Sequence, residues 1–208
     1  MPSKKAISRK SNRKTTSKKQ SRQKNKVEVL SSKTVFQGRV FSVNSDRVKE
    51  PSGIVVQRDI VRHGGSVVIL AVDESGPVPQ VLLERQYRYA ADDVLWELPA
   101  GCIDRGESSL AGAKRELLEE TGYRAKKWSR ALHYYPSPGF IDETMTIYFA
   151  RGLTAGPARP EADEFIIWEL VPLSRAFDMV LSGRICDGKT ITGVLWLAQI
   201  LGRHRSRP

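Results

Sequence analysis

Runs of apolar and β-branched residues predict strands in the first half of the chain. The clearest are residues 55–63, 66–73 and 80–89, which are separated by two glycines and by the turn-forming sequence ESGPVP. Residues 34–43 alternate apolar and polar side chains, which predicts a further strand at the edge of a sheet. The chain therefore begins with closely spaced strands that favour hairpins.

The second half adds strands and helices. Residues 128–135, 143–153 and 164–172 are strand-like, whereas residues 173–183 end on a glycine in the position of a helix C-cap. Residues 188–203 have a helical spacing of apolar side chains at Ile191, Leu195, Ala198 and Leu201. Strands before and after one central helix, without strict alternation, predict an α+β fold with a mixed sheet.

The central helix is expected to begin at Ser108 or Ser109 as N-cap and to stop at Gly122. On a helical wheel its apolar residues form one arc, which is the face predicted to be buried. Its acidic residues form another arc, with Gly112 in the middle, where a ligand can approach the backbone. The apolar arc contains Leu110, Ala111, Ala113, Leu117 and Leu118, and the acidic arc contains Glu116, Glu119 and Glu120.

The acidic arc carries more negative charge than the helix compensates. Glu116 and Glu120 are four residues apart, and such a like-charge pair costs about 0.2–0.5 kcal/mol. Arg115 reaches Glu119 but points away from Glu120. A bound divalent cation would supply the missing charge, and oxygen ligands without His or Cys favour Mg²⁺ or Mn²⁺ over zinc.

The positive charge of the chain is concentrated at its start. Residues 1–26 contain eleven Lys and Arg and no Asp or Glu, which predicts a disordered basic tail. Removing these eleven from the 34 basic residues leaves 23, equal to the 23 acidic residues, so residues 27–208 are formally neutral. Such a tail can attract nucleic acid through salt-sensitive contacts, but without aromatic residues to stack on bases we favour a solvated leader.

The sequence shows no clear secretion signal, membrane span or cysteine motif. The chain has neither a secretory apolar segment nor a run of about 18 apolar residues, so we expect no membrane span. Cys102 and Cys186 are far apart and form no CxxC motif, which argues against a zinc site or a disulfide framework. A cytoplasmic location is expected.

The acidic helix also lies within a recognisable signature. Gly101, five residues, Glu107, seven residues and then RELLEETGY resemble the Nudix box G-x5-E-x7-R-E-U-x-E-E-x-G-U, where U is aliphatic or aromatic, at every fixed position. The resemblance implies an α/β/α sandwich with a mixed sheet, in which a loop–helix–loop segment holds divalent cations. Family members hydrolyse a nucleoside diphosphate linked to another moiety. Residues 27–208 would form this domain.

Other segments are similar to the ADP-ribose pyrophosphatase branch of that family over nearly all of residues 34–203. They are QYRYA (86–90), WELPAG (96–101), YPSPGFIDE (135–143) and DGKTITGVLWL (187–197). The branch implies Mg²⁺-dependent hydrolysis of ADP-ribose to AMP and ribose 5-phosphate, by a homodimer whose N-terminal strands cross to the partner. Alternatives are another nucleoside diphosphate sugar as substrate, or a nucleic-acid-associated binding module that uses the basic tail.

Matching positions imply roles for individual residues. Glu116, Glu120 and the backbone carbonyl of Ala100 would be the main metal ligands, followed by Glu119 and Glu107. Arg115 would orient Glu107 or Glu119, although a plain ion pair is equally compatible with its spacing.

The remaining roles concern the base and the substrate. The loop RPEADEF (159–165) would supply the base that activates water, with Glu161 aligned best and Glu164 and Asp163 as rivals. Arginine pairs with phosphates or stacks on rings, but these arginines can also be surface charges, and the aromatic residue can belong to a core or interface. The implied substrate-binding residues are Arg62, Arg88, Ser137, Gly139, Glu143 and Phe36.

Overall fold

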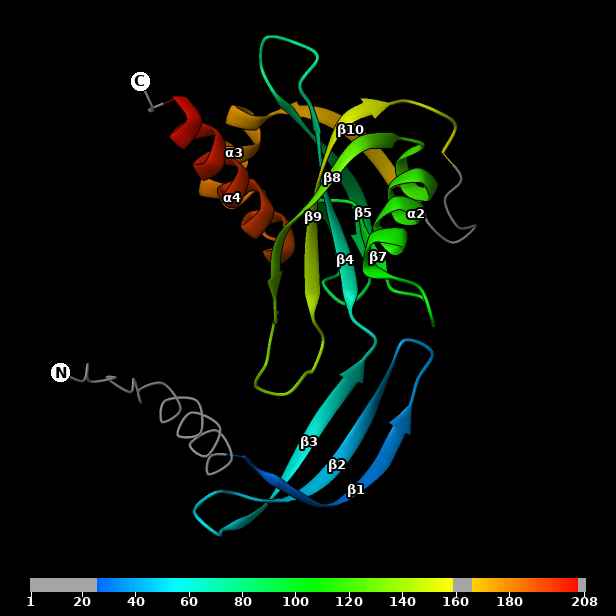
Figure 1. The fold of residues 1–208 in the computed structure, drawn as a ribbon, viewed down its shortest axis with the longest axis vertical. Helices are drawn as coiled ribbons and strands as arrows, with labels where there is room; N and C mark the ends of the chain where they lie inside the picture. Colours follow the sequence, from blue (N-terminus) through cyan, green and yellow to red (C-terminus); the bar gives the residue numbers. More distant parts are fainter. Residues whose placement is uncertain (1–25, 159–165, 206–208) are drawn as a thin grey trace, which may run out of the picture. The chain divides into compact units, whose positions relative to one another are not determined.

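The computed structural model describes residues 26–158 and 166–205. These residues belong to two compact units, and the boundary in the chain lies between Val61 and Arg62. Figure 1 shows the order of the elements along the chain. Within the described residues, no helix has the length and apolar character that a membrane span needs.

The first unit is a three-stranded sheet in the order β1-β2-β3, formed by β1 (Glu28–Gln37), β2 (Phe41–Lys49) and β3 (Val55–His63). β1 lies at its edge and pairs antiparallel with β2. The prediction of one strand over residues 34–43 was wrong, because the N–H of Gly38 donates to the carbonyl of Phe41 at 2.9 Å and closes a hairpin turn there. The apolar alternation continues through this turn, so the pattern alone conceals it.

The second unit is built on a mixed sheet of the described residues, with the order β10-β5-β4-β9-β8. β6 pairs with β5, β7 pairs with β4, and the β4–β9 pair is parallel while the others are antiparallel. The α+β fold with a mixed sheet is therefore confirmed. Its strands are β4 (Ser66–Asp73), β5 (Gln80–Arg88), β6 (Asp93–Glu97), β7 (Ala100–Cys102), β8 (Arg124–Tyr134), β9 (Met145–Thr154) and β10 (Ile166–Pro172).

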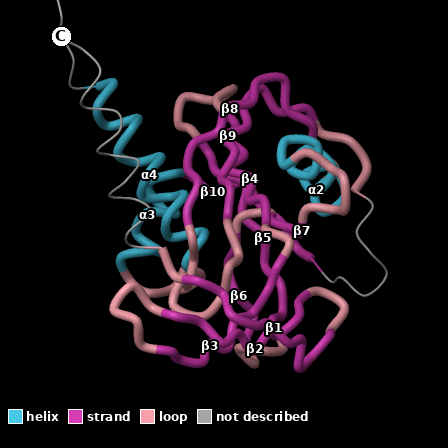
Figure 2. Tube along the Cα trace, turned by 60° about the horizontal axis from the view of Figure 1, so that its bottom comes forward, coloured by secondary structure: helices cyan, strands magenta, loops and turns pink. Residues whose placement is uncertain are grey.

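Helices cover both faces of this sheet (Figure 2). Helix α2 (Ser109–Thr121) lies on one face, and α3 (Leu173–Leu181) and α4 (Gly188–Arg205) lie on the other. The short strands β6 and β7 were not predicted, because three to five residues give too little periodicity to recognise.

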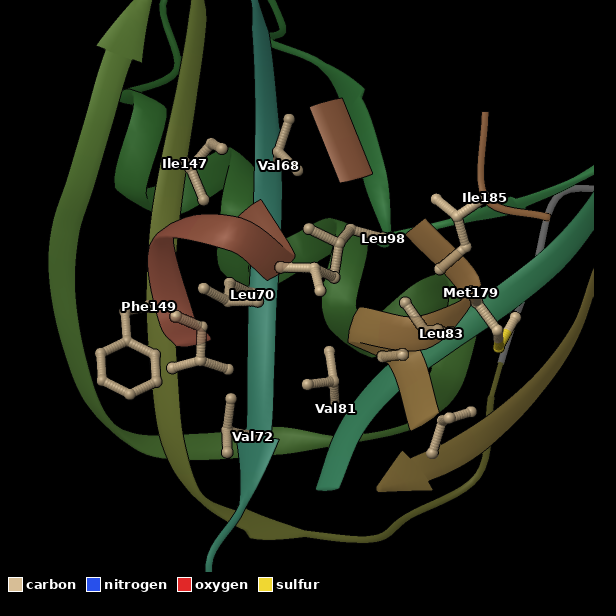
Figure 3. Packing of buried hydrophobic residues seen from close by; sticks show 14 residues of the cluster. Val68, Leu70, Val72, Val81, Leu83, Leu98, Ile147, Phe149, Met179 and Ile185 are labelled. Atoms are coloured by element: carbon tan, nitrogen blue, oxygen red, sulfur yellow. The ribbon is translucent and has the colours of Figure 1, made fainter. Parts of the chain in front are cut away.

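Strand β4 separates two hydrophobic cores. Alternate side chains along it point to opposite faces, as strand geometry requires. Val67, Ile69 and Ala71 pack with Ala113 and Leu117 of α2. The other core, drawn in Figure 3, includes Val68, Leu70, Val72, Met179, Val194 and Leu197. Since β4 is buried on both sides, α2 is held against a fully packed strand.

The ends of α2 agree with the sequence. The side chain of Ser108 accepts a hydrogen bond from the Ala111 N–H at 3.2 Å, and the N–H of Gly122 donates to the Leu118 carbonyl at 2.9 Å. Gly122 has a φ of 74°, and a Cβ there would lie 2.2 Å from the Gly156 carbonyl oxygen. Both observations require glycine.

The predicted buried face of α2 was only partly right. Ala113 and Leu117 are buried, but Ala111 is exposed. Gly112 and Glu120 are buried, and Glu120 is only 4% exposed. Gly112 is approached by the Glu107 carboxylate, which would lie 3.0 Å from a Cβ at that position. The helix therefore buries part of its acidic arc, which a wheel drawn for an isolated helix cannot show.

Candidate active site

Arg115 stands at the centre of the acidic cluster on α2. Its Nη1 donates to Glu116 at 2.8 Å and to Glu119 at 3.1 Å. Its Nε and Nη2 donate to Glu107, in the preceding loop, at 3.3 and 3.0 Å. Nη2 also donates to the carbonyl of Cys102 at 3.1 Å, which ties the helix to β7. One guanidinium thus collects three carboxylates from a loop and a helix.

The charges of this cluster shift the ionisation of its members. The hydrogen bond to Glu107 raises the pKa of Arg115, against the opposing effect of burial, and Glu116 and Glu119 add to the rise. The hydrogen bond from Arg115 in turn lowers the pKa of Glu107. The lowered pKa keeps Glu107 ionised near neutral pH, and one arginine facing three carboxylates leaves the cluster with an excess of negative formal charge.

Glu116 lies directly against the backbone of β7. A Cβ added to Gly101 would be 2.0 Å from Glu116 Oε1 and 2.2 Å from its Cδ, so a side chain at this position would push the carboxylate away. Only glycine therefore allows this carboxylate to reach the strand. Ala100, which pairs with Val68 of β4, is the residue immediately before this contact. The structure thus brings Glu116 next to the segment that contains the predicted carbonyl ligand.

Arg88 approaches the same region from the end of β5. Its Nε and Nη2 donate to Glu97 Oε1 and Oε2, both at 2.8 Å, in a two-point ion pair. This hydrogen bond is the largest cause that raises the pKa of Arg88, and the charges of Glu84 and Glu120 contribute. Arg88 is therefore not a plain surface charge. Glu120 and Arg88 are near enough for their charges to interact.

The ion pairs around Glu97 were not predicted from the sequence. Glu97 is 1% exposed and also accepts from Lys189, which contacts Asp187. The available signal was a charged residue between apolar neighbours in the segment LWELPA, because a charge that is buried needs a partner. Lys189, the second partner of Glu97, comes from the distant helix α4, so the local pattern could not identify it.

Arg62 contacts the loop between β8 and β9. Its Nη1 donates to Asp142 Oδ2 at 3.2 Å, and Glu143 accepts from the hydroxyl of Ser66 at 2.6 Å. Both carboxylates belong to the loop that contains Ser137 and Gly139. Arg62, like Arg88, is half-exposed and paired, with 41% of its side chain accessible.

The tip of this loop is a tight turn. The carbonyl of Ser137 accepts from the N–H groups of Phe140 and Ile141 at 3.4 and 3.2 Å. Gly139 is exposed, and a Cβ there would meet no atom within 4 Å. The predicted substrate residues Ser137, Gly139 and Glu143 thus lie in one loop, with Arg62 bound to it.

Other predicted residues lie in the first unit or outside the described residues. Phe36 belongs to the first unit, where it is 52% exposed and its ring centre lies 5.7 Å from that of Phe41. Glu161, Asp163 and Glu164 lie outside the described residues, as does the basic tail. Among the residues that are described, no three His, Cys, Asp or Glu side chains are arranged closely enough to hold a metal.

Comparisons with known proteins agree with this geometry. Residues 62–191 match the NUDIX domain. The chain is 40% identical over 174 residues to an ADP-ribose pyrophosphatase of Mycobacterium tuberculosis, covering 81% of each protein. It is 34% identical over 170 residues to an ADP-ribose pyrophosphatase of Bacillus subtilis, covering 81% of this chain and 90% of that protein.

A solved structure supports the fold independently. The crystal structure of an ADP compounds hydrolase superposes with a TM-score of 0.75 at 21% identity, over 88% of this chain and 97% of the other. A sequence identity this low supports the fold alone. The domain match and the sequence relatives support membership of the family. The chain belongs to the Nudix hydrolase family.

Proposed function

We propose that this Nudix hydrolase cleaves the pyrophosphate bond of ADP-ribose with the help of Mg²⁺ and releases AMP and ribose 5-phosphate. The observation that carries the proposal is the contact of Glu116 with Gly101, inside a cluster of carboxylates collected by Arg115. The relatives from Mycobacterium tuberculosis and Bacillus subtilis, both ADP-ribose pyrophosphatases, support the choice of substrate.

The chemistry of the donor groups fits a hard divalent cation. Glu107, Glu116, Glu119 and Glu120 offer carboxylate oxygens, and Ala100 offers a carbonyl, which are the ligands that Mg²⁺ and Mn²⁺ prefer. The missing Cβ of Gly101 leaves room for Glu116 beside this carbonyl group. Together, the loop, α2 and β7 would form the loop–helix–loop metal site of an α/β/α sandwich. A bound cation there would neutralise the pyrophosphate and lower the pKa of the attacking water.

Arg115 keeps the carboxylates ready for this task. Its hydrogen bonds to Glu107, Glu116 and Glu119 limit the rotation of three flexible side chains. Such outer contacts commonly set ligand orientation and metal affinity.

The proton of the attacking water needs an acceptor. We assign this role to Glu161, with Glu164 and Asp163 as alternatives, because the acidic loop that precedes β10 corresponds in position to the loop that supplies the base in this branch. Arg88 and Arg62 would pair with the pyrophosphate oxygens, since arginine binds phosphate through two parallel N–H bonds.

The sugar and base of the substrate would meet other residues. Glu143 can accept hydrogen bonds from ribose hydroxyl groups, and the turn at Ser137 and Gly139 allows close approach of the backbone. Phe36 offers an exposed ring that can cover an adenine. We further propose a cytoplasmic homodimer of residues 27–208, with residues 1–26 as a disordered basic tail. The free cysteines Cys102 and Cys186 suit a reducing compartment.

The proposal is tested by a substrate panel. Purified protein with Mg²⁺ is given ADP-ribose, ADP-glucose, GDP-mannose, NADH or capped RNA, and the products are separated and quantified. We expect AMP and ribose 5-phosphate from ADP-ribose at the highest kcat/KM. A higher kcat/KM with another nucleotide sugar would replace the substrate and keep the chemistry.

Two variants of one helix provide the control. Glu116→Gln removes the charge of a proposed ligand, and we expect the loss of most turnover. Lys114→Met changes an exposed residue of the same helix, and we expect wild-type rates. Equal activity of Glu116→Gln and wild type would exclude the proposed metal site.

A further inference from the structure

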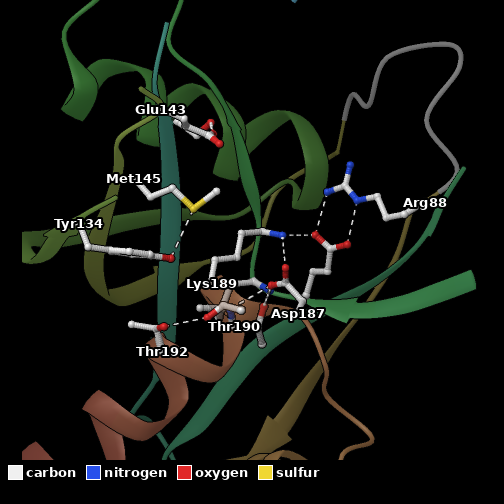
Figure 4. A network of polar contacts seen from close by, with 12 residues as sticks. Arg88, Tyr134, Glu143, Met145, Asp187, Lys189, Thr190 and Thr192 are labelled. Atoms are coloured by element: carbon white, nitrogen blue, oxygen red, sulfur yellow. Dashed lines mark hydrogen bonds and ion pairs between the residues drawn. The ribbon is translucent and has the colours of Figure 1, made fainter. Parts of the chain in front are cut away.

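The first turn of α4 carries a buried ion pair that the proposed chemistry does not use. Lys189 is 9% exposed, and its ammonium donates to Glu97 Oε2 and lies 3.1 Å from Asp187 Oδ1 (Figure 4). Taking two charges out of water costs several kcal/mol per ion unless the pairing is good.

Glu97 connects Lys189 to Arg88. The two cations come from β5 and α4, and both bind the same carboxylate, which is 1% exposed. Nε and Nη2 of Arg88 give two of its five N–H groups to Glu97. The other groups lie on the edge of the guanidinium that faces away from Glu97, and 39% of the side chain is exposed. Glu97 therefore determines the direction in which Arg88 can bind an anion.

The same turn of α4 also supports the strand that leads to the metal site. The hydroxyl of Thr190 accepts the Leu98 N–H at 2.8 Å and donates to Asp187 Oδ2 at 2.6 Å. The carbonyl of the following residue, Pro99, accepts from the Ile69 N–H at 2.8 Å. Residues 97–99 are thus held from α4 on one side and from β4 on the other, directly before Ala100.

We propose that Lys189 is a positioning residue of this hydrolase, which holds the Glu97 carboxylate so that Arg88 faces the pyrophosphate of the substrate. The inference rests on the proposed function, because it assigns the anion bound by Arg88. Lys189 does not touch the substrate. It acts by limiting the orientations of Glu97, and hence of the guanidinium bound to it.

The pKa of Glu97 agrees with a carboxylate that is shared by Arg88 and Lys189. Burial alone raises the pKa of Glu97, but the hydrogen bonds from Arg88 and the charge of Lys189 outweigh burial and lower it. Glu97 therefore stays ionised and keeps both oxygens as acceptors. Without Lys189, one oxygen loses its second donor, and the carboxylate gains rotational freedom that it passes to Arg88.

A double-mutant cycle tests the connection. We expect Lys189→Met to raise the KM for ADP-ribose about 10-fold, with a smaller change in kcat, because Arg88 binds phosphate before and during the reaction. In an Arg88→Met background, Lys189→Met should change kcat/KM less than about 2-fold, because its effect passes through Arg88. Thr192→Val, in the same turn of α4, is the control and should behave as wild type.

A second readout does not require turnover. In ¹⁵N NMR spectra, the Arg88 Nε–H, identified by its loss in Arg88→Met, should exchange with water more slowly in the wild type than in Lys189→Met. If Lys189→Met does not fold, Lys189→Gln keeps a polar end in the buried site and should give the same change in a smaller degree. Melting curves identify the folded variants.

The outcomes separate the two ideas. Additive effects of the two substitutions, or unchanged exchange at Arg88 in a folded Lys189 variant, would overturn the positioning role. A wild-type protein that leaves ADP-ribose intact would overturn the proposed substrate. The exchange of the Arg88 Nε–H would then still decide whether Lys189 holds Glu97 and Arg88 together.

Discussion

Gly101→Ala offers a sharp test of the proposed metal site. The new Cβ would lie 2.0 Å from Glu116 Oε1 and 2.6 Å from Oε2, whereas ordinary contacts begin at 3.4 Å. The carboxylate must therefore retreat by about 1.4 Å. The nearest atoms are the end of a flexible side chain, so the backbone of β7 need not move. The substitution thus displaces one proposed ligand without removing it.

The expected effects follow from this displacement. A shift of about 1 Å in a reacting arrangement can cost about 10²-fold in rate, so we expect kcat for ADP-ribose to fall about 100-fold. Metal affinity should fall by about 10-fold or more, as when the contacts that orient a ligand are lost. The free energy of unfolding should change little. A Gly→Ala substitution at an ordinary φ stabilises a protein by about 0.4–1 kcal/mol, which offsets the strain of moving the Glu116 carboxylate.

The assay combines three measurements on the purified variant. Product formation gives kcat, titration with Mn²⁺ gives metal affinity, and thermal unfolding gives stability. Gly76→Ala is the matched control, because a Cβ at Gly76 meets nothing within 4 Å and Gly76 lies in the β4–β5 loop. A Gly101→Ala variant with wild-type metal affinity and rate would refute the reasoning, since the contact of Glu116 with this strand would then have no role.

Three other predictions concern the same cluster. Glu120→Gln should lower kcat by about 100-fold or more while circular dichroism shows an intact fold, because glutamine keeps the shape of a side chain that is 4% exposed; unchanged turnover would exclude Glu120 as a ligand. Arg115→Lys should raise the Mg²⁺ concentration needed for half-maximal rate about 10-fold, because one ammonium cannot bind Glu107, Glu116 and Glu119 in the same geometry. An unchanged Mg²⁺ dependence would contradict this role of Arg115. Because Arg115 lowers the pKa of Glu107 from its usual 4.5, Glu107 stabilises the fold fully above about pH 4.5, and this contribution is lost as the pH falls through the lowered pKa. Urea unfolding at a series of acidic pH values should therefore show a weaker loss of stability for Glu107→Gln than for wild type, and parallel curves would argue against the pairing.

Local signals in the chain were sufficient for the centre of the site. Ser108 and Gly122 mark the ends of α2 because capping depends on a few adjacent residues. The spacing of Arg115 and Glu119 brings their side chains together, because helix geometry places residues four apart on one side, whereas the pairing of Arg115 with Glu107 followed from the family signature. The Arg115–Glu119 ion pair therefore needed no knowledge of the rest of the fold.

Other features depend on contacts between distant segments. Glu120 was placed in the acidic arc and not on the face predicted to be buried, yet it is only 4% exposed. Glu97 and Lys189 are 92 positions apart, so no periodicity connects them. The hairpin at Gly38 was missed because alternation of side chains does not record where a strand turns.

The sequence by itself thus determined the family signature, the acidic helix and the central strands, since these depend on spacing and hydrophobic period along a short stretch of chain. The tertiary structure decided which carboxylates are buried, which carboxylate a side chain at position 101 would displace, and which partner holds Arg88. The physical reason is that burial and ion pairing depend on what the packed sheet and α4 bring against each residue, and these neighbours come from elsewhere in the chain.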